Sequence, residues 1–211
     1  MTPDALNHLR QDATLARIID QTDIPTSVSD WTNDLYLALL ESIVSQQISV
    51  KAADAIFGRF RGLFPDRYPH ADALLLLSTE ELRSAGLSGQ KVNYLRSVAE
   101  FSLANELSID YVNGLSDEEV VQYLIPIRGV GRWTVEMLLL FVLDRPDVFP
   151  IDDLVIRQRM MRAYPEQTAG LTGRALYAAL HAIADQWSPY RSTASKYLWR
   201  WRPDTPPVAA P

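Results

Sequence analysis

The chain has 211 residues, 47% hydrophobic and 22% charged, which suits one large domain or two small lobes of a globular protein. It has no cysteine, which excludes a disulfide scaffold, a thiol nucleophile, a cysteine-bound zinc site and a cysteine-bound iron–sulfur cluster. Its three widely spaced histidines argue against a histidine metal site. The longest apolar run, Met137 to Leu143, is too short to cross a bilayer, and the N-terminus lacks the apolar region of a signal peptide. We therefore expect a cytoplasmic protein without membrane partners.

The net charge of −6 argues at first sight against a nucleic-acid partner, but the charge is unevenly distributed. Residues 1–119 carry 9 Lys and Arg against 18 Asp and Glu, whereas residues 120–211 carry 11 against 8. A local basic face on an acidic molecule is therefore possible, and scattered, solvated charges are the alternative.

Helical periodicity dominates the chain from one end to the other. The first stripe, Leu35, Leu39 and Ile43, has the i, i+4, i+8 spacing of an amphipathic helix. The same spacing recurs from Val92 to Leu103 and from Leu176 to Trp187, and no segment alternates like a strand. These patterns predict an all-α protein of about ten short helices.

Local signals mark where helices begin and where the ordered chain ends. Ser78 with Glu81, and Ser116 with Glu119, have the spacing of capping boxes at helix N-termini. The tail, residues 203–211, contains four prolines and is expected to be disordered.

The most informative stretch lies around Gly129-Val130-Gly131, which separates two helical patterns. Paired glycines let the backbone turn tightly and approach another chain closely, because no Cβ intervenes. The helix that follows would point unpaired N–H groups outward, where they can bind phosphate, and Arg132 adds a positive charge. The alternative is an ordinary helical hairpin with a glycine cap.

The segments around these glycines resemble those of a known protein family. Leu124 to Thr134 resembles the helix–hairpin–helix motif of DNA repair glycosylases, and Val148 to Asp153 resembles the segment with that superfamily's essential aspartate. The resemblance runs from about residue 30 to 202. Three further segments are similar to those of AlkA-type 3-methyladenine DNA glycosylases: Ser42 to Ser49, Gly86 to Lys91, and Trp187 to Ser192.

The resemblance implies a fold and a function. The fold would be two helical lobes with a cleft between them: residues 34–137, ending with the hairpin, and residues 1–33 joined to 138–211. The function would be that of a monofunctional DNA glycosylase, which flips an alkylated base out of double-stranded DNA and hydrolyses its N-glycosidic bond in base excision repair. We expect a monomer that needs no cofactor. The alternatives are a non-catalytic helix–hairpin–helix DNA-binding module and a helical interaction protein without DNA.

The resemblance assigns the catalytic role to Asp153, whose carboxylate would stabilise an oxocarbenium-like transition state. Asp152 is expected to cap the helix that begins near Leu154; the alternative is that both aspartates only cap it. Trp133 stands where bifunctional members carry the Schiff-base lysine, so no lyase activity is expected. No second carboxylate or histidine stands out as a general acid, which fits a base that is already cationic.

The remaining expected roles also come from the resemblance. Trp133 and Trp187 would line an aromatic base pocket, with Met137 and Leu154 at positions that are tyrosine in familiar members; the alternative is that the tryptophans are core residues. A wedge would fill the gap left by the flipped base, and a solvated helix end is the alternative for its residues. The wedge residues would be Gln46 and Gln47. The DNA-binding residues would be Gly129, Gly131, Arg132 and Thr134. A monovalent Na+ or K+ would be bound by the backbone carbonyls of Ile125, Ile127 and Val130.

Overall fold

The computed structural model describes residues 2–24 and 34–203, and within these ranges all regular structure is helical. It contains fourteen α-helices and one 3-10 helix (η1), so the all-α prediction is confirmed. The estimate of ten helices was too low because several segments between chain breakers form helices of only one or two turns. The expected disorder of the tail lies outside the described residues, apart from Pro203. None of the described helices is long and apolar enough to cross a membrane.

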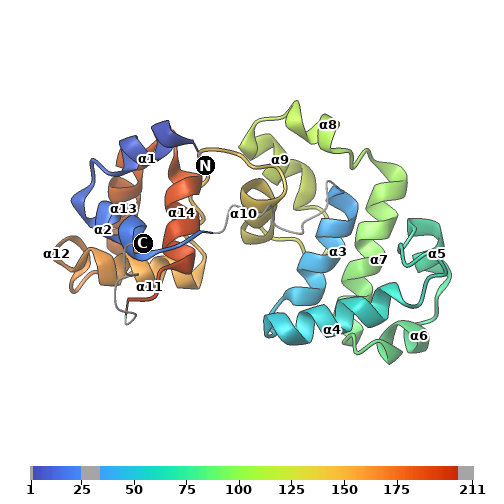
Figure 1. Cartoon of the computed structure of the whole chain (residues 1–211). Coiled ribbons are helices and arrows are strands. Elements are labelled where there is room, and N and C mark those ends of the chain that lie inside the picture. The colour runs from blue at the N-terminus through green and yellow to red at the C-terminus, as the bar shows by residue number, and fades with distance from the viewer. Residues whose placement is uncertain (1, 25–33, 204–211) are drawn as a thin grey trace. The chain divides into compact units, whose positions relative to one another are not determined.

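The described residues fall into two compact units (Figure 1). Unit 1 combines residues 2–24 with 144–203, and unit 2 is the continuous stretch 34–143. The expected boundary at residue 137 lies inside a helix of unit 2, Arg132–Phe141, which continues for one further turn.

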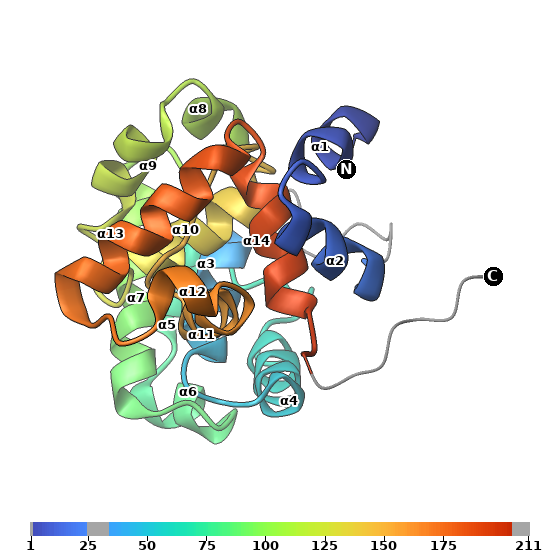
Figure 2. The same cartoon turned by 90° about the vertical axis from the view of Figure 1, so that its left-hand side faces the viewer.

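Unit 1 is built from helices at both ends of the described chain, and α14 contacts both α2 and α11 (Figure 2). Its helices are α1 (Pro3–Leu9), α2 (Ala13–Gln21), α11 (Leu154–Ala163), α12 (Pro165–Thr168), α13 (Gly173–Ala184), η1 (Asp185–Trp187) and α14 (Arg191–Arg200).

The core of unit 1 surrounds Trp187, the largest fully buried side chain. Its indole Nε1 donates to Asp12 Oδ2 at 3.1 Å, and the Tyr164 hydroxyl donates to the same oxygen at 2.7 Å. The other oxygen of Asp12 caps α2 by accepting from the backbone N–H groups of Thr14 and Leu15. One carboxylate therefore joins the N-terminal helices to the core formed by later segments.

Unit 2 is organised around α3, which is buried along nearly its whole length and packs against α4 and α7. Such burial explains its strongly apolar sequence. The capping boxes predicted at Ser78 and Ser116 are both present, at the starts of α6 and α9. The helices of this unit are α3 (Leu35–Ser45), α4 (Val50–Arg61), α5 (Ala71–Leu76), α6 (Thr79–Ser84), α7 (Gly89–Ala104), α8 (Ile109–Asn113), α9 (Asp117–Leu124) and α10 (Arg132–Phe141).

Candidate functional site

The predicted hairpin is the connection between α9 and α10 in unit 2. Two turn hydrogen bonds shape it, from Ile127 N to the Leu124 carbonyl and from Val130 N to the Ile127 carbonyl. Gly129 has φ +91°, and a Cβ there would lie 2.3 Å from the ring of Tyr94. The fold itself therefore requires a glycine at residue 129.

Gly131 differs from Gly129 in a way that bears on function. It is the N-cap of α10 with φ −105°, and a Cβ at this position would meet no atom within 4 Å. Neither backbone strain nor internal packing requires a glycine here. The missing side chain instead leaves open space beside the N-terminus of a ten-residue helix that has no side-chain cap.

Two of the expected phosphate-contact residues, Arg132 and Thr134, have partners or packing within unit 2, and their contact with DNA stays a prediction. The Arg132 guanidinium donates from Nη2 to both oxygens of Glu118, at 2.8 and 2.9 Å, so its charge is engaged by a neighbouring helix. This hydrogen bond helps to hold the pKa of Glu118 below its usual value. Thr134 is 3% exposed, so its side chain is buried in unit 2, and only its backbone N–H in the first turn of α10 stays a candidate for a phosphate contact.

The predicted wedge residues follow the end of α3 and differ from each other. Gln46 is half-buried, and its Nε2 donates to the Gly129 carbonyl at 3.0 Å. Gln47 is exposed, with a left-handed φ of +60°. Lys91 Nζ donates to the carbonyls of Val44 and Gln46, at 2.7 and 3.0 Å. In the sequence, Lys91 stands out only as the last residue of the segment Gly86 to Lys91 that is similar to AlkA-type glycosylases, and no pattern predicts its contact with α3.

Asp153 lies in unit 1 at the start of α11 and is 5% exposed. Its Oδ1 accepts a hydrogen bond from Ile156 N at 2.9 Å, so Asp153 is the N-cap of the helix. The expectation that Asp152 is the cap was wrong: Asp152 is exposed and accepts from the Tyr177 hydroxyl at 2.9 Å. This capping hydrogen bond fixes the orientation of the Asp153 carboxylate.

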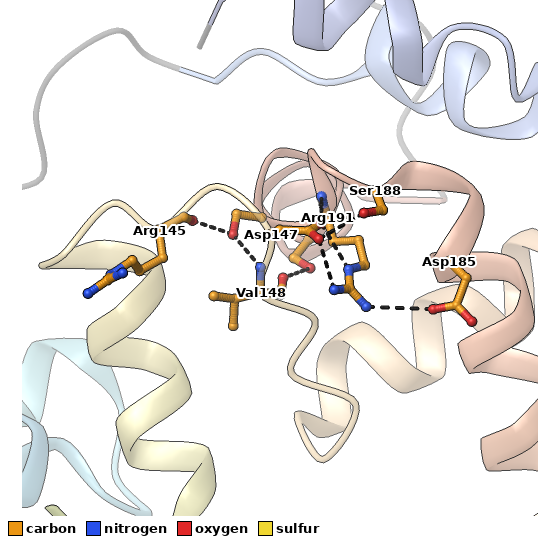
Figure 3. Close-up of polar contacts among 8 residues, drawn as sticks. Arg145, Asp147, Val148, Asp185, Ser188 and Arg191 are labelled. Atoms are coloured by element: carbon orange, nitrogen blue, oxygen red, sulfur yellow. Dashed lines mark hydrogen bonds and ion pairs between the residues drawn. The ribbon is translucent and has the colours of Figure 1, made fainter. Parts of the chain in front are cut away.

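The segment that leads to Asp153 is anchored to the beginning of α14 (Figure 3). Asp147 accepts hydrogen bonds from Arg191 and from the Ser188 hydroxyl, while Val148 N donates to Ser192 Oγ at 2.8 Å. Val148, Ser188, Arg191 and Ser192 lie in segments that stand out in the sequence, but their contacts could not be predicted. The partners are more than 40 positions apart, and no spacing rule relates them.

The four predicted pocket residues are divided between the two units. Trp133 (39% exposed) and Met137 (9%) lie on α10 of unit 2. Leu154 (56%) and Trp187 (1%) lie in unit 1, where Trp187 is a core residue, as its alternative role predicts. A pocket formed by all four stays a prediction.

Comparison with known proteins identifies the family. Residues 40–177 match the HhH-GPD superfamily of base excision DNA repair proteins, and the chain belongs to this superfamily. It is 36% identical over 169 residues to DNA-3-methyladenine glycosylase 1 of Schizosaccharomyces pombe, covering 78% of this chain and 71% of that protein.

Solved structures agree with this assignment. The structure of a 3-methyladenine DNA glycosylase of S. pombe in complex with abasic DNA matches with a TM-score of 0.77 and 31% identity, over 93% of this chain and 95% of that one. A DNA-3-methyladenine glycosidase of Bacillus halodurans matches with a TM-score of 0.76 and 31% identity, over 94% and 88%. The described residues of this chain therefore have the fold of DNA glycosylases.

Proposed function

We propose that the protein is a monofunctional DNA glycosylase that removes alkylated, 3-methyladenine-type bases from double-stranded DNA, acting as a monomer on chromosomal DNA. The observation that carries this proposal is the buried carboxylate of Asp153, held in one direction by its cap, in a chain of the HhH-GPD superfamily. The relatives named above as 3-methyladenine glycosylases support the choice of base.

Asp153 would act at the sugar of the damaged nucleotide. The bond between C1′ and the base breaks, the base leaves with the electron pair, and the sugar becomes positively charged in the transition state. A carboxylate held against that sugar stabilises the charge and orients the attacking water, which adds to C1′ and passes a proton to the carboxylate. A base alkylated to a cation leaves as a neutral molecule, so this step needs no general acid.

Trp133 sets the outcome of the reaction. An indole cannot form a Schiff base with C1′, so the product would be an abasic site in an intact strand. Its indole is 39% exposed and would stack on a cationic base, with Met137 and Leu154 as further pocket candidates. Trp187 is the weakest of the four candidates because its indole is buried and already donates its N–H to Asp12.

The hairpin would hold the DNA backbone. The open space at Gly131, beside the N-terminus of α10, lets a phosphate approach backbone N–H groups that a side chain would otherwise cover. Gln47 is the better candidate for the wedge because its side chain is exposed, whereas the Gln46 amide is engaged by Gly129.

The carbonyls of Ile125, Ile127 and Val130 remain candidates for binding a monovalent cation. They are neutral oxygens of the connection between α9 and α10, a type of ligand that suits Na+ or K+. The Ile127 carbonyl also accepts from Val130 N, which leaves it one lone pair for an ion. Such an ion would brace the hairpin and take no part in bond cleavage.

The decisive experiment incubates the protein with duplexes that carry either one 3-methyladenine-type lesion or no lesion, and then treats them with alkali. Base release from the alkylated duplex appears as strand breaks after alkali. A non-catalytic DNA-binding module would bind the duplexes and produce no breaks, and a helical interaction protein would not bind them.

A further inference from the structure

One face of α7 contacts both segments that the proposed function assigns to DNA. Lys91, Tyr94 and Ser97 follow one another at intervals of three, which places them on one side of the helix. Lys91 holds the end of α3, the Tyr94 ring lies against Gly129, and Ser97 Oγ accepts from Arg128 N at 3.1 Å. The wedge segment and the hairpin thus rest on the same rigid support.

Lys91 provides the charged contact on this face. The last carbonyls of a helix have no partner within the helix and form its negative end. Lys91 Nζ donates to the carbonyl of Val44 in the last turn of α3 and to that of Gln46 at its C-cap. Two charge-assisted hydrogen bonds therefore fix the place where the chain leaves α3 toward Gln47.

A direct link between the two segments completes the arrangement. The Gln46 side chain donates to the Gly129 carbonyl, so the wedge segment and the hairpin are also joined to each other. Gln47 follows in a left-handed conformation that L residues adopt only at an energetic cost, and its neighbours must therefore hold it there.

We propose that Lys91 is a positioning residue for base removal: it fixes the exit of α3 so that Gln47 enters the base stack at a set distance from the phosphates held by the hairpin. This inference rests on the proposed glycosylase function. Loss of Lys91 should therefore impair opening of the stack, while the hairpin's hold on undamaged DNA persists.

The first test compares Lys91→Met, which keeps most of the side-chain length, with Lys91→Arg and with the matched control Lys51→Met. Lys51 is an exposed residue of α4, so its variant reports the loss of one positive charge alone. Folding is checked by thermal melting. We measure the single-turnover rate of base release at saturating protein, the affinity for undamaged duplex, and 2-aminopurine fluorescence beside the lesion as a report of unstacking.

Lys91→Met should lower the release rate and the unstacking signal about tenfold, the effect of about 1.4 kcal/mol at 25 °C. Its affinity for undamaged duplex should match that of Lys51→Met. Lys91→Arg should recover most of the rate, because a guanidinium can also donate to carbonyls. A folded Lys91→Met variant with the wild-type rate would overturn the inference, as would an equal loss in Lys51→Met.

A double-mutant cycle with Gln47→Ala separates positioning from a general effect on stability. If Lys91 acts through Gln47, Lys91→Met should cost little further rate once the Gln47 side chain is absent. A full, additive loss would contradict the inference and assign Lys91 a purely structural role. If the wild-type protein releases no base from any duplex, the proposed function fails instead, so the two failures are distinguishable.

Discussion

Arg191 surrounds the carboxylate of Asp147: its backbone N and Nε donate to Oδ1 at 3.2 and 2.9 Å, and its Nη2 donates to Oδ2 at 2.9 Å. The pair lies at the start of α14 and holds the chain six residues before Asp153. A planar guanidinium suits this contact because it offers donors in a fixed arrangement, which a lysine cannot reproduce. The pair therefore has consequences for both stability and the catalytic segment.

The first prediction concerns acid stability. Burial alone would raise the pKa of Asp147, but hydrogen bonds from Arg191 and Ser188 outweigh it and hold the pKa below the ordinary 3.8. As the pH falls, the Asp147 carboxyl of the unfolded chain binds a proton before that of the folded chain does. The stability that this pair contributes is therefore present above the unfolded-state pKa, at about pH 4, and is lost as the pH falls through the lower folded-state pKa. Urea unfolding should be measured from about pH 2.5 to about pH 6, which covers both pKa values. The free energy of unfolding should fall less with acid in Asp147→Asn than in wild type. Equal pH slopes in the two proteins would contradict the assignment.

The second prediction concerns catalysis. Asp153→Asn keeps a side-chain oxygen for the cap but loses the charge, so base release should fall on the order of 100–1,000-fold while duplex binding persists. Asp152→Asn is the matched control, since its amide oxygen can still accept from Tyr177, and its effect should be much milder. Near-normal turnover in a folded Asp153→Asn variant would refute the assignment. Single-turnover base release and anisotropy binding measure the two effects.

The third prediction concerns the reaction product. Because Trp133 cannot form a Schiff base, strands should break only after added alkali or a separate lyase. Borohydride added during the reaction should trap no covalent protein–DNA adduct. A shifted band on a denaturing gel would show that another amine attacks C1′.

The fourth prediction separates the two hairpin glycines. Gly131→Val has room within the fold, so the variant should fold and bind every duplex more weakly, with unchanged lesion preference. Gly129→Ala places a Cβ against Tyr94 at a positive φ, so it should lower the melting temperature. If Gly131→Val folds with intact DNA affinity, the hairpin does not hold phosphates as proposed.

The fifth prediction concerns salt dependence. With Arg132 held by Glu118 in an acidic protein, the slope of log affinity against log salt should be shallow, on the order of −2 to −5. Glu118→Gln removes the carboxylate that engages Arg132, so it should raise affinity and steepen the slope by about 0.9, one phosphate contact. Glu100→Gln, the same charge change on an exposed residue of α7, is the control. A slope that changes equally in both variants would show that only net charge matters.

The features that local sequence could predict are those governed by neighbours along the chain. The capping box at Ser116 and the turn at Gly129 depend on residues within one or two helical turns, and both are present. The choice of Asp152 over Asp153 as the cap was wrong although the helix begins at Leu154 as expected: Asp153 was assigned only the catalytic role, but its Oδ1 also accepts the capping hydrogen bond from Ile156 N.

Contacts between distant segments could not be predicted in this way. Arg132 is a reasonable phosphate ligand by its position, but Glu118, fourteen residues earlier, engages it through the packing of α9 against α10. The contact of Lys91 with the end of α3 depends likewise on how α3 and α7 pack, because Lys91 and Val44 are 47 positions apart. Helix periodicity shows which face of each helix is buried and does not say which partner covers it.

The construction of unit 1 from both ends of the described chain has a consequence for synthesis on the ribosome. Unit 2 is continuous and can complete its core while later residues are still being added. The N-terminal helices cannot, because Leu15, Ile18 and Ile19 of α2 pack in a core with helices translated more than a hundred residues later. At translation rates of about 5–20 residues per second, these apolar side chains wait on the order of 10 s for their partners. The apolar face of α2 thus leaves the ribosome before unit 2 and is buried after it, so during this interval it stays exposed to solvent.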